Sequence, residues 1–464
     1  MAASDHTERQ DDSAFAGRSA LSRAAHVRVV FGEPALIREL DSRGTSFGRT
    51  SDCDAADVVF DDARMSRRHA RIVHDTLGWQ LLDLGSRNGG YVNGAALRPH
   101  TAVALHDGAV IRLGDSIFVF RTEASPPREA ESDAFPGGSL PASRVRDRLR
   151  KLAGASGHVL ILGETGTGKE RAARMIRREG WPFVPQNCAE LTRELARSEL
   201  FGHVRGAFSG ASAAKPGLVE IAANGVLFLD EIGELALDVQ GDLLRFLEDG
   251  TYRPVGATDL RRSTARVVAA TNVNLEDAVL RGGFRRDLLA RLRASNTPLQ
   301  LPPLRERRED ILSWADYFLR EAGVAPARAW NAGAAECLLL ARWPENLREL
   351  RGIVREQAGS EPRWPVSSSA LPEFLQSYRL SLRQTDDAGV PARPAEPGVA
   401  PARPRTLSTD PTRDEIVAVL KRTNGQMRAT SEALDIDRRK LYRLCEQHGI
   451  DFGAYRPMAN RDED

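Results

Sequence analysis

The stretch from Gly163 to Lys169 has the residue types and spacing that bind a polyphosphate. It follows the apolar run VLIL at 159–162 and precedes a helix-length stretch. Glycines allow successive backbone N–H groups to surround phosphate oxygens, and a lysine adds a cation near the outer phosphates. A turn that only joined a strand to a helix would not need this lysine. We therefore predict a nucleotide site formed by Gly163, Glu164, Thr165, Gly166, Thr167, Gly168, Lys169 and Glu170.

A second apolar run, VLFL at 226–229, ends in Asp230 and Glu231. A buried strand that presents two carboxylates at its carboxyl end suits phosphoryl transfer, in which one acid holds Mg²⁺ and the other polarises an attacking water. A solvated Asp-Glu pair would not need the apolar residues before it. With the glycine-rich loop, these acids predict that the chain binds ATP.

A set of donors in the first part of the chain could bind an anion. These donors are Arg49, Ser66, Arg67 and Asn88, in loops between short apolar runs. Arginine and hydroxyl donors together satisfy the acceptor oxygens of a phosphate group. His69, on an alternating run, is expected to be a buried structural histidine. The alternative is a domain that only packs against the rest of the chain.

The run DRRKLYRLCEQHG at 437–449 predicts a basic helix. Its polar positions near the start are Arg438, Arg439, Lys440, Tyr442 and Arg443, while Leu441, Leu444 and Cys445 recur at helical spacing. Such a helix can enter the major groove of DNA, or it can belong to a small bundle that binds protein.

Three folded segments must position these residues. At roughly 150 residues per domain, a chain of 464 residues holds about three domains. Short alternating runs and turns predict an all-β sandwich over 26–122. Strand-like runs that alternate with helices predict a parallel α/β sheet over 139–378, purely helical from about 305. Three short helices are expected over 410–453, and the Pro- and Ala-rich stretches 123–138 and 379–409 are expected to be linkers.

Composition excludes several other classes of protein. The chain has 65 Lys+Arg and 64 Asp+Glu, so its net charge of +1 argues against a uniformly basic or acidic chain. The 4 cysteines are scattered and support neither a disulfide framework nor a zinc site. No apolar run approaches the length of a membrane span, and the polar N-terminal stretch does not resemble a signal peptide. A cytoplasmic protein is therefore expected.

Residues 139–378 resemble the AAA+ domain of bacterial enhancer-binding proteins, the ATPases that activate sigma-54 RNA polymerase. The resemblance rests on GETGTGKE, FVPQNCAEL, GVLFLDEIGEL, RVVAATN, GGFRRDLLARL, LPPLRERREDI and WPENLREL in the family's order. It implies that Lys169 meets the β- and γ-phosphates, Asp230 holds Mg²⁺ and Glu231 activates water. It also implies that Asn187 restrains Glu231 and that Asn272 and Arg348 are sensors of the nucleotide. Arg285 and Arg291 match two arginines that reach a neighbouring subunit's nucleotide.

The run GAFSGA at 206–211 is the most diagnostic part of this resemblance. Small residues around one exposed aromatic are typical of a contact loop. In the family this loop, usually GAFTGA, grips sigma-54, which assigns that contact to Gly206, Ala207, Phe208, Ser209, Gly210 and Ala211. Ser209 keeps the hydroxyl of the usual threonine. A second departure is Glu345, where the family has glycine.

The outer segments resemble two binding modules. FGR, SRRH, LGSRNG and VNG within 47–94 resemble a forkhead-associated (FHA) domain, which binds phosphothreonine peptides. The resemblance implies that Arg49 and Ser66 contact the phosphate, that Asn88 contacts the peptide backbone, and that Gly48 and His69 shape the site. GQMRATSEALDIDRRKLYRL at 425–444 resembles a Fis-type helix-turn-helix.

These observations favour a transcriptional regulator that binds ATP, Mg²⁺ and upstream DNA. We expect an AAA+ ring, a hexamer that binds DNA through dimers, which remodels sigma-54 RNA polymerase. The FHA domain implies a phosphothreonine protein or an upstream Ser/Thr kinase as a partner. Two alternatives are a generic AAA+ remodelling ATPase or chaperone, and a DNA-binding phospho-adaptor whose ATPase is idle.

Overall fold

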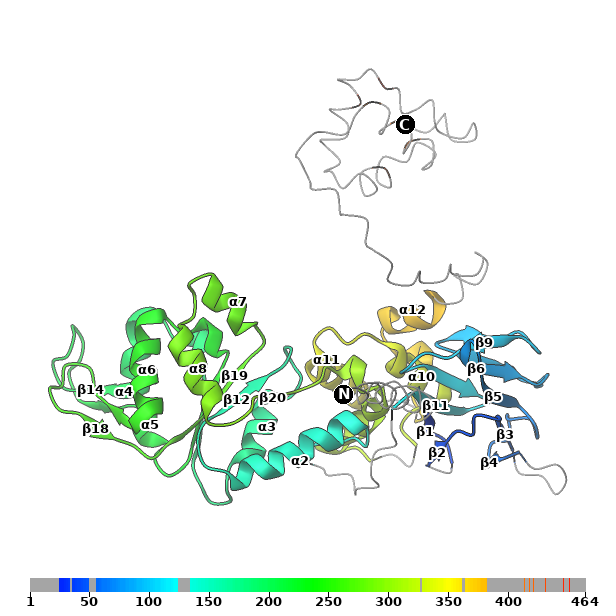
Figure 1. The fold of residues 1–464 in the computed structure, drawn as a ribbon, viewed down its shortest axis with the longest axis horizontal. Helices are drawn as coiled ribbons and strands as arrows, with labels where there is room; N and C mark the ends of the chain where they lie inside the picture. Colours follow the sequence, from blue (N-terminus) through cyan, green and yellow to red (C-terminus); the bar gives the residue numbers. More distant parts are fainter. Residues whose placement is uncertain are drawn as a thin grey trace, which may run out of the picture. The chain divides into compact units, whose positions relative to one another are not determined.

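A computed structural model of the chain describes residues 25–33, 36–49, 56–123, 134–325, 328–360 and 364–381, and the single positions 413, 417, 420, 430, 445 and 450. The chain divides into two compact units, residues 1–389 and 390–464. Figure 1 shows the fold of the first unit. The predicted basic helix, with Arg438, Arg439, Lys440, Tyr442 and Arg443, lies outside the described residues.

The first domain is a sandwich of two β-sheets, as its alternating pattern predicts. The sheets have the strand orders β2-β1-β11-β10-β7-β8 and β4-β3-β5-β6-β9. The strands are β1 (His26–Phe31), β2 (Ile37–Glu39), β3 (Thr45–Arg49), β4 (Val58–Phe60), β5 (Ala70–Asp75), β6 (Gly78–Asp83), β7 (Gly90–Val92), β8 (Ala95–Ala96), β9 (Ala102–Ala104), β10 (Val110–Leu113) and β11 (Ser116–Arg121). Phe47, Phe60 and Phe118 meet edge to face in the core between the sheets.

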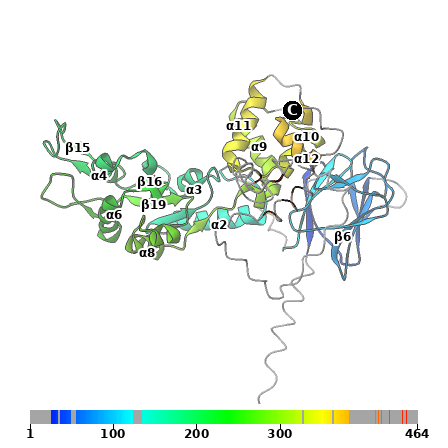
Figure 2. The same ribbon diagram turned by 90° about the horizontal axis from the view of Figure 1, so that it is seen from above.

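The second domain contains a parallel sheet of order β13-β16-β19-β12-β20. Its strands are β12 (Val159–Leu162), β13 (Phe183–Asn187), β16 (Val226–Asp230), β19 (Arg266–Thr271) and β20 (Leu299–Gln300). Val159 and Ile161 enter one buried cluster and Leu160 enters another, so helices cover both faces (Figure 2). Parallel strands end at the same edge, which brings the loops after β12, β13, β16 and β19 together.

The helices around this sheet are α2 (Leu140–Gly154), α3 (Lys169–Ile176), α4 (Arg193–Phe201), α5 (Leu218–Ile221), α6 (Leu237–Asp249), α7 (Leu275–Leu280) and α8 (Arg286–Ala294). Helices α2 and α7 begin at side-chain caps. The Ser139 side chain accepts a hydrogen bond from the Ala142 backbone at the start of α2, and Asn274 caps α7 in the same way.

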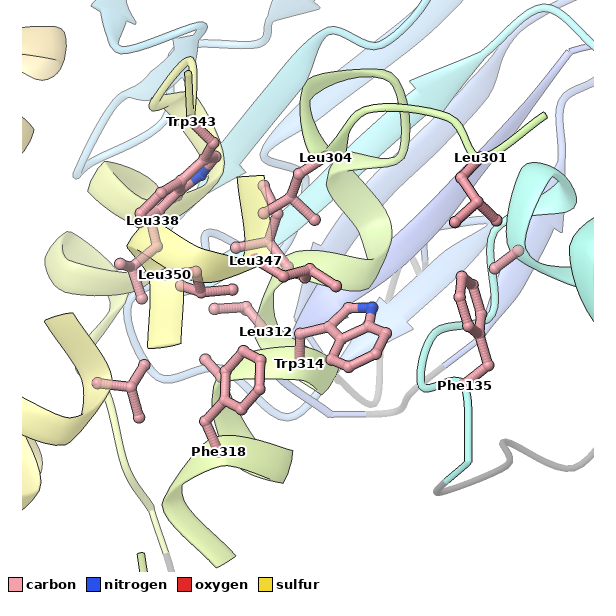
Figure 3. Packing of buried hydrophobic residues seen from close by; sticks show 14 of the residues in the cluster. Phe135, Leu301, Leu304, Leu312, Trp314, Phe318, Leu338, Trp343, Leu347 and Leu350 are labelled. Atoms are coloured by element: carbon pink, nitrogen blue, oxygen red, sulfur yellow. The ribbon is translucent and has the colours of Figure 1, made fainter. Parts of the chain in front are cut away.

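A helical lid follows the sheet. Two 3₁₀ turns, η3 (Leu304–Glu306) and η4 (Arg308–Asp310), lead into α9 (Ile311–Glu321), α10 (Ala332–Leu340), α11 (Asn346–Gly359) and α12 (Glu373–Ser381). Trp314, Phe318, Leu347 and Leu350 pack between these elements (Figure 3). Among the described residues, no helix has the length and apolar character that crossing a membrane requires.

The expected linker over 123–138 is packed where it is described. Phe135 is fully buried, and its ring meets that of Trp314 edge to face at 5.6 Å. The backbone carbonyl of Gly137 accepts a hydrogen bond from the Arg146 guanidinium at 2.5 Å. Composition alone could not detect this anchoring, because a single aromatic residue among Pro, Gly and charged residues provides it.

Candidate functional site

The loop between β12 and α3 is shaped around Lys169. This side chain is 6% exposed, and its ammonium group donates to the carbonyls of Gly163 at 3.1 Å and Glu164 at 3.4 Å. The Thr167 hydroxyl donates to the Glu164 carbonyl at 2.8 Å, which closes the turn. At Gly166, whose φ is 76°, a side chain would collide with the backbone carbonyl of Glu345 in the lid. Glycine is therefore required there.

Asp230 and Glu231 face this loop from the carboxyl end of β16. Glu231 Oε1 lies 3.6 Å from Lys169 Nζ. Burial raises the pKa of Asp230, and the nearby Lys169 opposes this effect. Glu231 has a φ of 49°, which is uncommon outside glycine and is typical of strained functional positions. A carboxylate beside a phosphate loop is a donor set that suits Mg²⁺.

The two predicted asparagines lie at the same sheet edge. The Asn272 backbone N–H donates to Glu231 Oε2 at 3.2 Å, and its side chain donates to Thr165 Oγ1 at 2.9 Å. Asn187 pairs with Asp230 in the sheet register. Its side-chain oxygen accepts from the Ala189 backbone at 3.0 Å and caps the following turn. The Glu231 side chain thus contacts Lys169 and Asn272, whereas the contact of the Asn187 side chain is with Ala189.

Arg291 lies at the end of β12 opposite the phosphate loop of its own chain, and Arg285 is the N-cap residue of the same helix, α8. Arg285 is exposed at the start of α8 and pairs with Asp287 at 2.7 Å. Arg291 donates to the carbonyls of Leu247 at 2.8 Å and Glu248 at 3.2 Å. It lines a cavity of about 410 Å³ with His158, at the amino end of β12. Strand β12 covers roughly 13 Å between this cavity and the phosphate loop at its other end.

The lid contributes residues that the sequence analysis did not select. The Asn346 amide donates to the Thr165 carbonyl at 3.0 Å and to Glu164 Oε2 at 3.2 Å. Arg305 holds both oxygens of the Glu164 carboxylate, at 2.6 and 2.7 Å. These hydrogen bonds from Arg305 lower the pKa of Glu164. Arg348, which was predicted, is exposed beside Gly166. The motifs LPPLRER and WPENLREL contained both missed residues, but only spatial contact identifies them.

The backbone of the lid accommodates Glu345 at the position where the family has glycine. Glu345 has φ −99° and ψ 16°, a conformation that does not require glycine. The positive φ angles in this turn occur at Trp343 and Asn346 instead, at 52° and 53°.

The predicted contact loop 206–211 projects from a small hairpin of β14 (Gly202–His203) and β15 (Lys215–Pro216). The Gly206 N–H donates to the Ala211 carbonyl at 2.8 Å and closes the loop. Phe208 is 40% exposed, and its ring meets the His203 ring at 5.1 Å. An exposed aromatic on a closed loop is suited to binding another macromolecule.

The donors predicted to bind phosphate gather at one end of the β-sandwich. Arg49 is exposed at the end of β3, and its backbone N–H donates to the Ser66 carbonyl at 3.1 Å. Ser66 Oγ accepts from the Arg87 backbone at 3.0 Å, and the Asn88 amide donates to the Arg64 carbonyl at 2.7 Å. The exposed Arg87, which the sequence analysis did not select, therefore lies beside the predicted site.

Two further residues shape this end of the sandwich. His69 is fully buried and accepts from the Ser66 backbone at 3.1 Å, as expected for a structural histidine. Burial lowers the pKa of this histidine. A side chain at Gly48 would collide with the carbonyl of Arg67, so this position requires glycine. Arg67 itself is exposed.

The fold and the site together define a P-loop protein of the AAA+ class joined to an FHA domain. Residues 137–297 match the family model of the sigma-54 interaction domain, residues 305–387 that of the AAA+ ATPase lid domain, and residues 45–114 that of the FHA domain. The chain is 36% identical over 410 residues to the nitric oxide reductase transcription regulator NorR1 of Cupriavidus necator, with 81% of this chain and 79% of that protein covered. The chain belongs to the family of transcription regulators that carry a sigma-54 interaction domain.

The chain is also similar to two other proteins. The chain is 40% identical over 315 residues to the alginate biosynthesis transcriptional regulatory protein AlgB of Pseudomonas syringae pv. tomato, with 66% of this chain covered. It spans 65% of the length of that protein. The crystal structure of NtrX from Brucella abortus in complex with ADP is 29% identical, with a TM-score of 0.47, and the match covers 68% of this chain and 69% of NtrX.

Proposed function

We propose that the chain uses ATP hydrolysis to remodel sigma-54 RNA polymerase and so opens promoters. The observation that supports this most directly is the presence, in one domain, of an assembled hydrolytic site and an exposed aromatic loop. Glu231 contacts both Lys169 and Asn272 at the phosphate loop, while Phe208 is exposed on the hairpin. A regulator with an idle ATPase would not need the first feature, and a generic remodelling ATPase would not need GAFSGA.

The site residues have distinct tasks in this proposal. The backbone of Gly163–Gly168 binds the phosphates, and Lys169 neutralises the outer ones. Asp230 would hold Mg²⁺, which supplies further neutralisation of the phosphate charge when bound. Glu231 takes a proton from the attacking water, and Asn272 holds the Glu231 carboxylate in position. Arg285 and Arg291 act on the nucleotide of a neighbouring subunit in a hexameric ring.

The flanking domains provide localisation and regulation. Residues 438–443 would bind upstream DNA as part of a dimeric helix-turn-helix. The FHA domain would bind a phosphothreonine protein, the product of a Ser/Thr kinase, through Arg49, Ser66, Arg67 and Asn88. Arg87 adds a cation beside these donors.

The Phe208→Ala variant tests the contact with sigma-54. We expect promoter opening to fall by about tenfold or more, as for loss of an aromatic anchor at an interface. ATP turnover should stay within about twofold, because Phe208 does not contact the phosphate loop. The measurement is ATP-dependent open-complex formation by sigma-54 RNA polymerase on a template with upstream DNA.

Phe374→Ala is the matched control, because Phe374 is a similarly exposed phenylalanine, 45% exposed, on lid helix α12. It should leave promoter opening unchanged. Absence of sigma-54-dependent opening by the unmodified chain, with and without the phosphorylating kinase, would contradict the proposed function.

The Arg49→Ala variant tests phosphate recognition. We expect binding of a degenerate phosphothreonine peptide pool to weaken by about 10- to 100-fold, the value of a hydrogen bond to a charged group. The measurement is fluorescence anisotropy, with the dephosphorylated pool as a reference. Arg38→Ala, an exposed arginine on edge strand β2, serves as the control. Equal binding by the unmodified chain and the Arg49 variant would reject phosphate recognition at this site.

A further inference from the structure

The segment Leu304–Asp310 at the start of the lid contacts the phosphate loop on one side. Arg305 makes two hydrogen bonds to the Glu164 carboxylate. Arg307 is fully buried, and its guanidinium donates to the Thr167 carbonyl at 3.2 Å. The same guanidinium lies 5.1 Å from the centre of the Phe135 ring. Two residues of this short segment therefore fix the positions of two residues of the loop.

The same segment contacts the FHA domain on its other side. Arg121, the last residue of β11, donates to both oxygens of Glu309, each at 2.6 Å. The two side chains are 8% and 3% exposed. Arg121 also donates to the backbone carbonyl of Glu306 at 2.9 Å, and Arg308 donates to the Gly108 carbonyl at 3.0 Å. A buried, bidentate ion pair has a well-defined geometry.

The FHA domain is also anchored to the lid beyond this segment. Arg112 on β10 pairs with Glu336 on α10 at 2.9 Å, and Glu336 is 1% exposed. Val110 and Ile117 belong to the same apolar cluster as the lid helices. Because these strands share the core of the lid, a shift of the FHA domain must be accommodated by the lid segments in contact with it.

The residue of the segment that binds the FHA domain is next in sequence to the residue that binds the phosphate loop. The carbonyl bound by Arg121 belongs to Glu306, and the neighbouring residue, Arg305, holds Glu164 in the phosphate loop. A displacement of Arg121 would therefore reach the loop through one peptide unit. The segment therefore has a buried ion pair on the FHA side, and an exposed ion pair and a buried arginine on the side of the phosphate loop.

We propose that Leu304–Asp310 couples the FHA domain to the phosphate loop, so that occupancy of the phosphopeptide site changes the affinity for nucleotide. Arg121, Glu309 and Arg305 are positioning residues, since each acts on the nucleotide through another residue. The regulatory part of this inference depends on the proposed phosphothreonine binding. The mechanical part, the coupling of Arg121 to Arg305, does not.

A double-mutant cycle on the full chain tests the mechanical part. The cycle compares the affinity for a fluorescent ADP analogue in Arg121→Ala, Arg305→Ala and the double variant. We expect each single variant to weaken binding by about fivefold or more, the lower range of allosteric coupling. The double variant should be no weaker than Arg305→Ala alone, because the two residues act in series. Arg351→Ala, which removes an exposed ion pair with Glu321 in the same lid, should bind as the unmodified chain does.

Two results would overturn the coupling. One is a folded Arg121→Ala chain, with unchanged circular dichroism, that keeps the normal affinity. The other is a double variant whose effect is the sum of the two single effects. Glu309→Gln repeats the test with a smaller change in shape, should Arg121→Ala fail to fold.

The regulatory part is tested by the same titration with saturating degenerate phosphothreonine peptide pool. The pool should change nucleotide affinity by about fivefold or more in the unmodified chain and should leave it unchanged in Arg121→Ala. A peptide pool that binds without changing nucleotide affinity would overturn this part. A pool that does not bind at all would overturn the proposed phosphothreonine function, while the double-mutant cycle still decides the mechanical part.

Discussion

Replacement of Glu231 by glutamine is expected to slow ATP hydrolysis by about 10²- to 10⁴-fold, the usual contribution of a general base. Glutamine has the shape of glutamate, so its side-chain oxygen can still accept from the Asn272 backbone. Its amide does not take a proton from water. Lys169 keeps its bonds to the Gly163 and Glu164 carbonyls, and nucleotide affinity should therefore change little.

Phosphate release measures the turnover of this variant, and a fluorescent ATP analogue measures its binding. Glu234→Gln is the matched control, because Glu234 is an exposed acid on the 3₁₀ turn that begins directly after Glu231. Turnover close to normal in Glu231→Gln would reject Glu231 as the base. An unmodified chain that binds ATP without hydrolysing it would instead support the phospho-adaptor alternative.

Arg291→Ala is expected to reduce ATP turnover by about 10³- to 10⁵-fold, the range for loss of an arginine finger. Mixing this variant with Glu231→Gln should restore turnover, although each variant is inactive alone. In a mixed ring, a subunit with intact Glu231 can lie next to a subunit with intact Arg291, which together complete one site. The expectation follows from the position of Arg291 at the amino end of β12, far from its own phosphate loop.

The stability of the Arg291→Ala variant must be measured as a control in this experiment. Arg291 donates to the carbonyls of Leu247 and Glu248 near the end of α6, so its removal could loosen that helix. Thermal unfolding of each variant resolves this point, and Arg286→Ala, an exposed neighbour, should behave normally in all assays. Folded variants that show no recovery on mixing would contradict a shared site. Arg285→Ala can be tested against Glu231→Gln in the same way.

The site residues that the sequence predicts best are those whose position depends on a single strand. Lys169, Asp230 and Asn272 each follow an apolar run, and a parallel sheet brings such positions to one edge whatever the order of its strands. The contacts of Asn346 and Arg305 could not be predicted, because they depend on how the lid packs on the loop. Asn187 ends a strand at the same edge, where its side-chain oxygen caps a turn, and its restraint of Glu231 stays a prediction.

The contact between the FHA domain and the lid has a signature in the sequence. All residues of β11, SIFVFR, are buried. A sheet with one face in water alternates apolar and polar residues, whereas a strand covered on both faces does not. The continuous apolar run at 117–120 therefore indicated a second covering layer. The covering layer is helix α10, which the run itself could not identify because the helix lies more than two hundred residues further along the chain.

The burial of α10 has a practical consequence for dissecting this protein. Every residue of this helix except Gly333 is buried, Glu336 included. A shortened chain that begins at α2 would lose Val110, Ile117 and Arg112 together, leaving an apolar surface in water beside a carboxylate deprived of its arginine. Such surfaces favour self-association. Activity lost on truncation would then report insolubility, and point substitutions in the full-length chain are the cleaner way to separate sensing from catalysis.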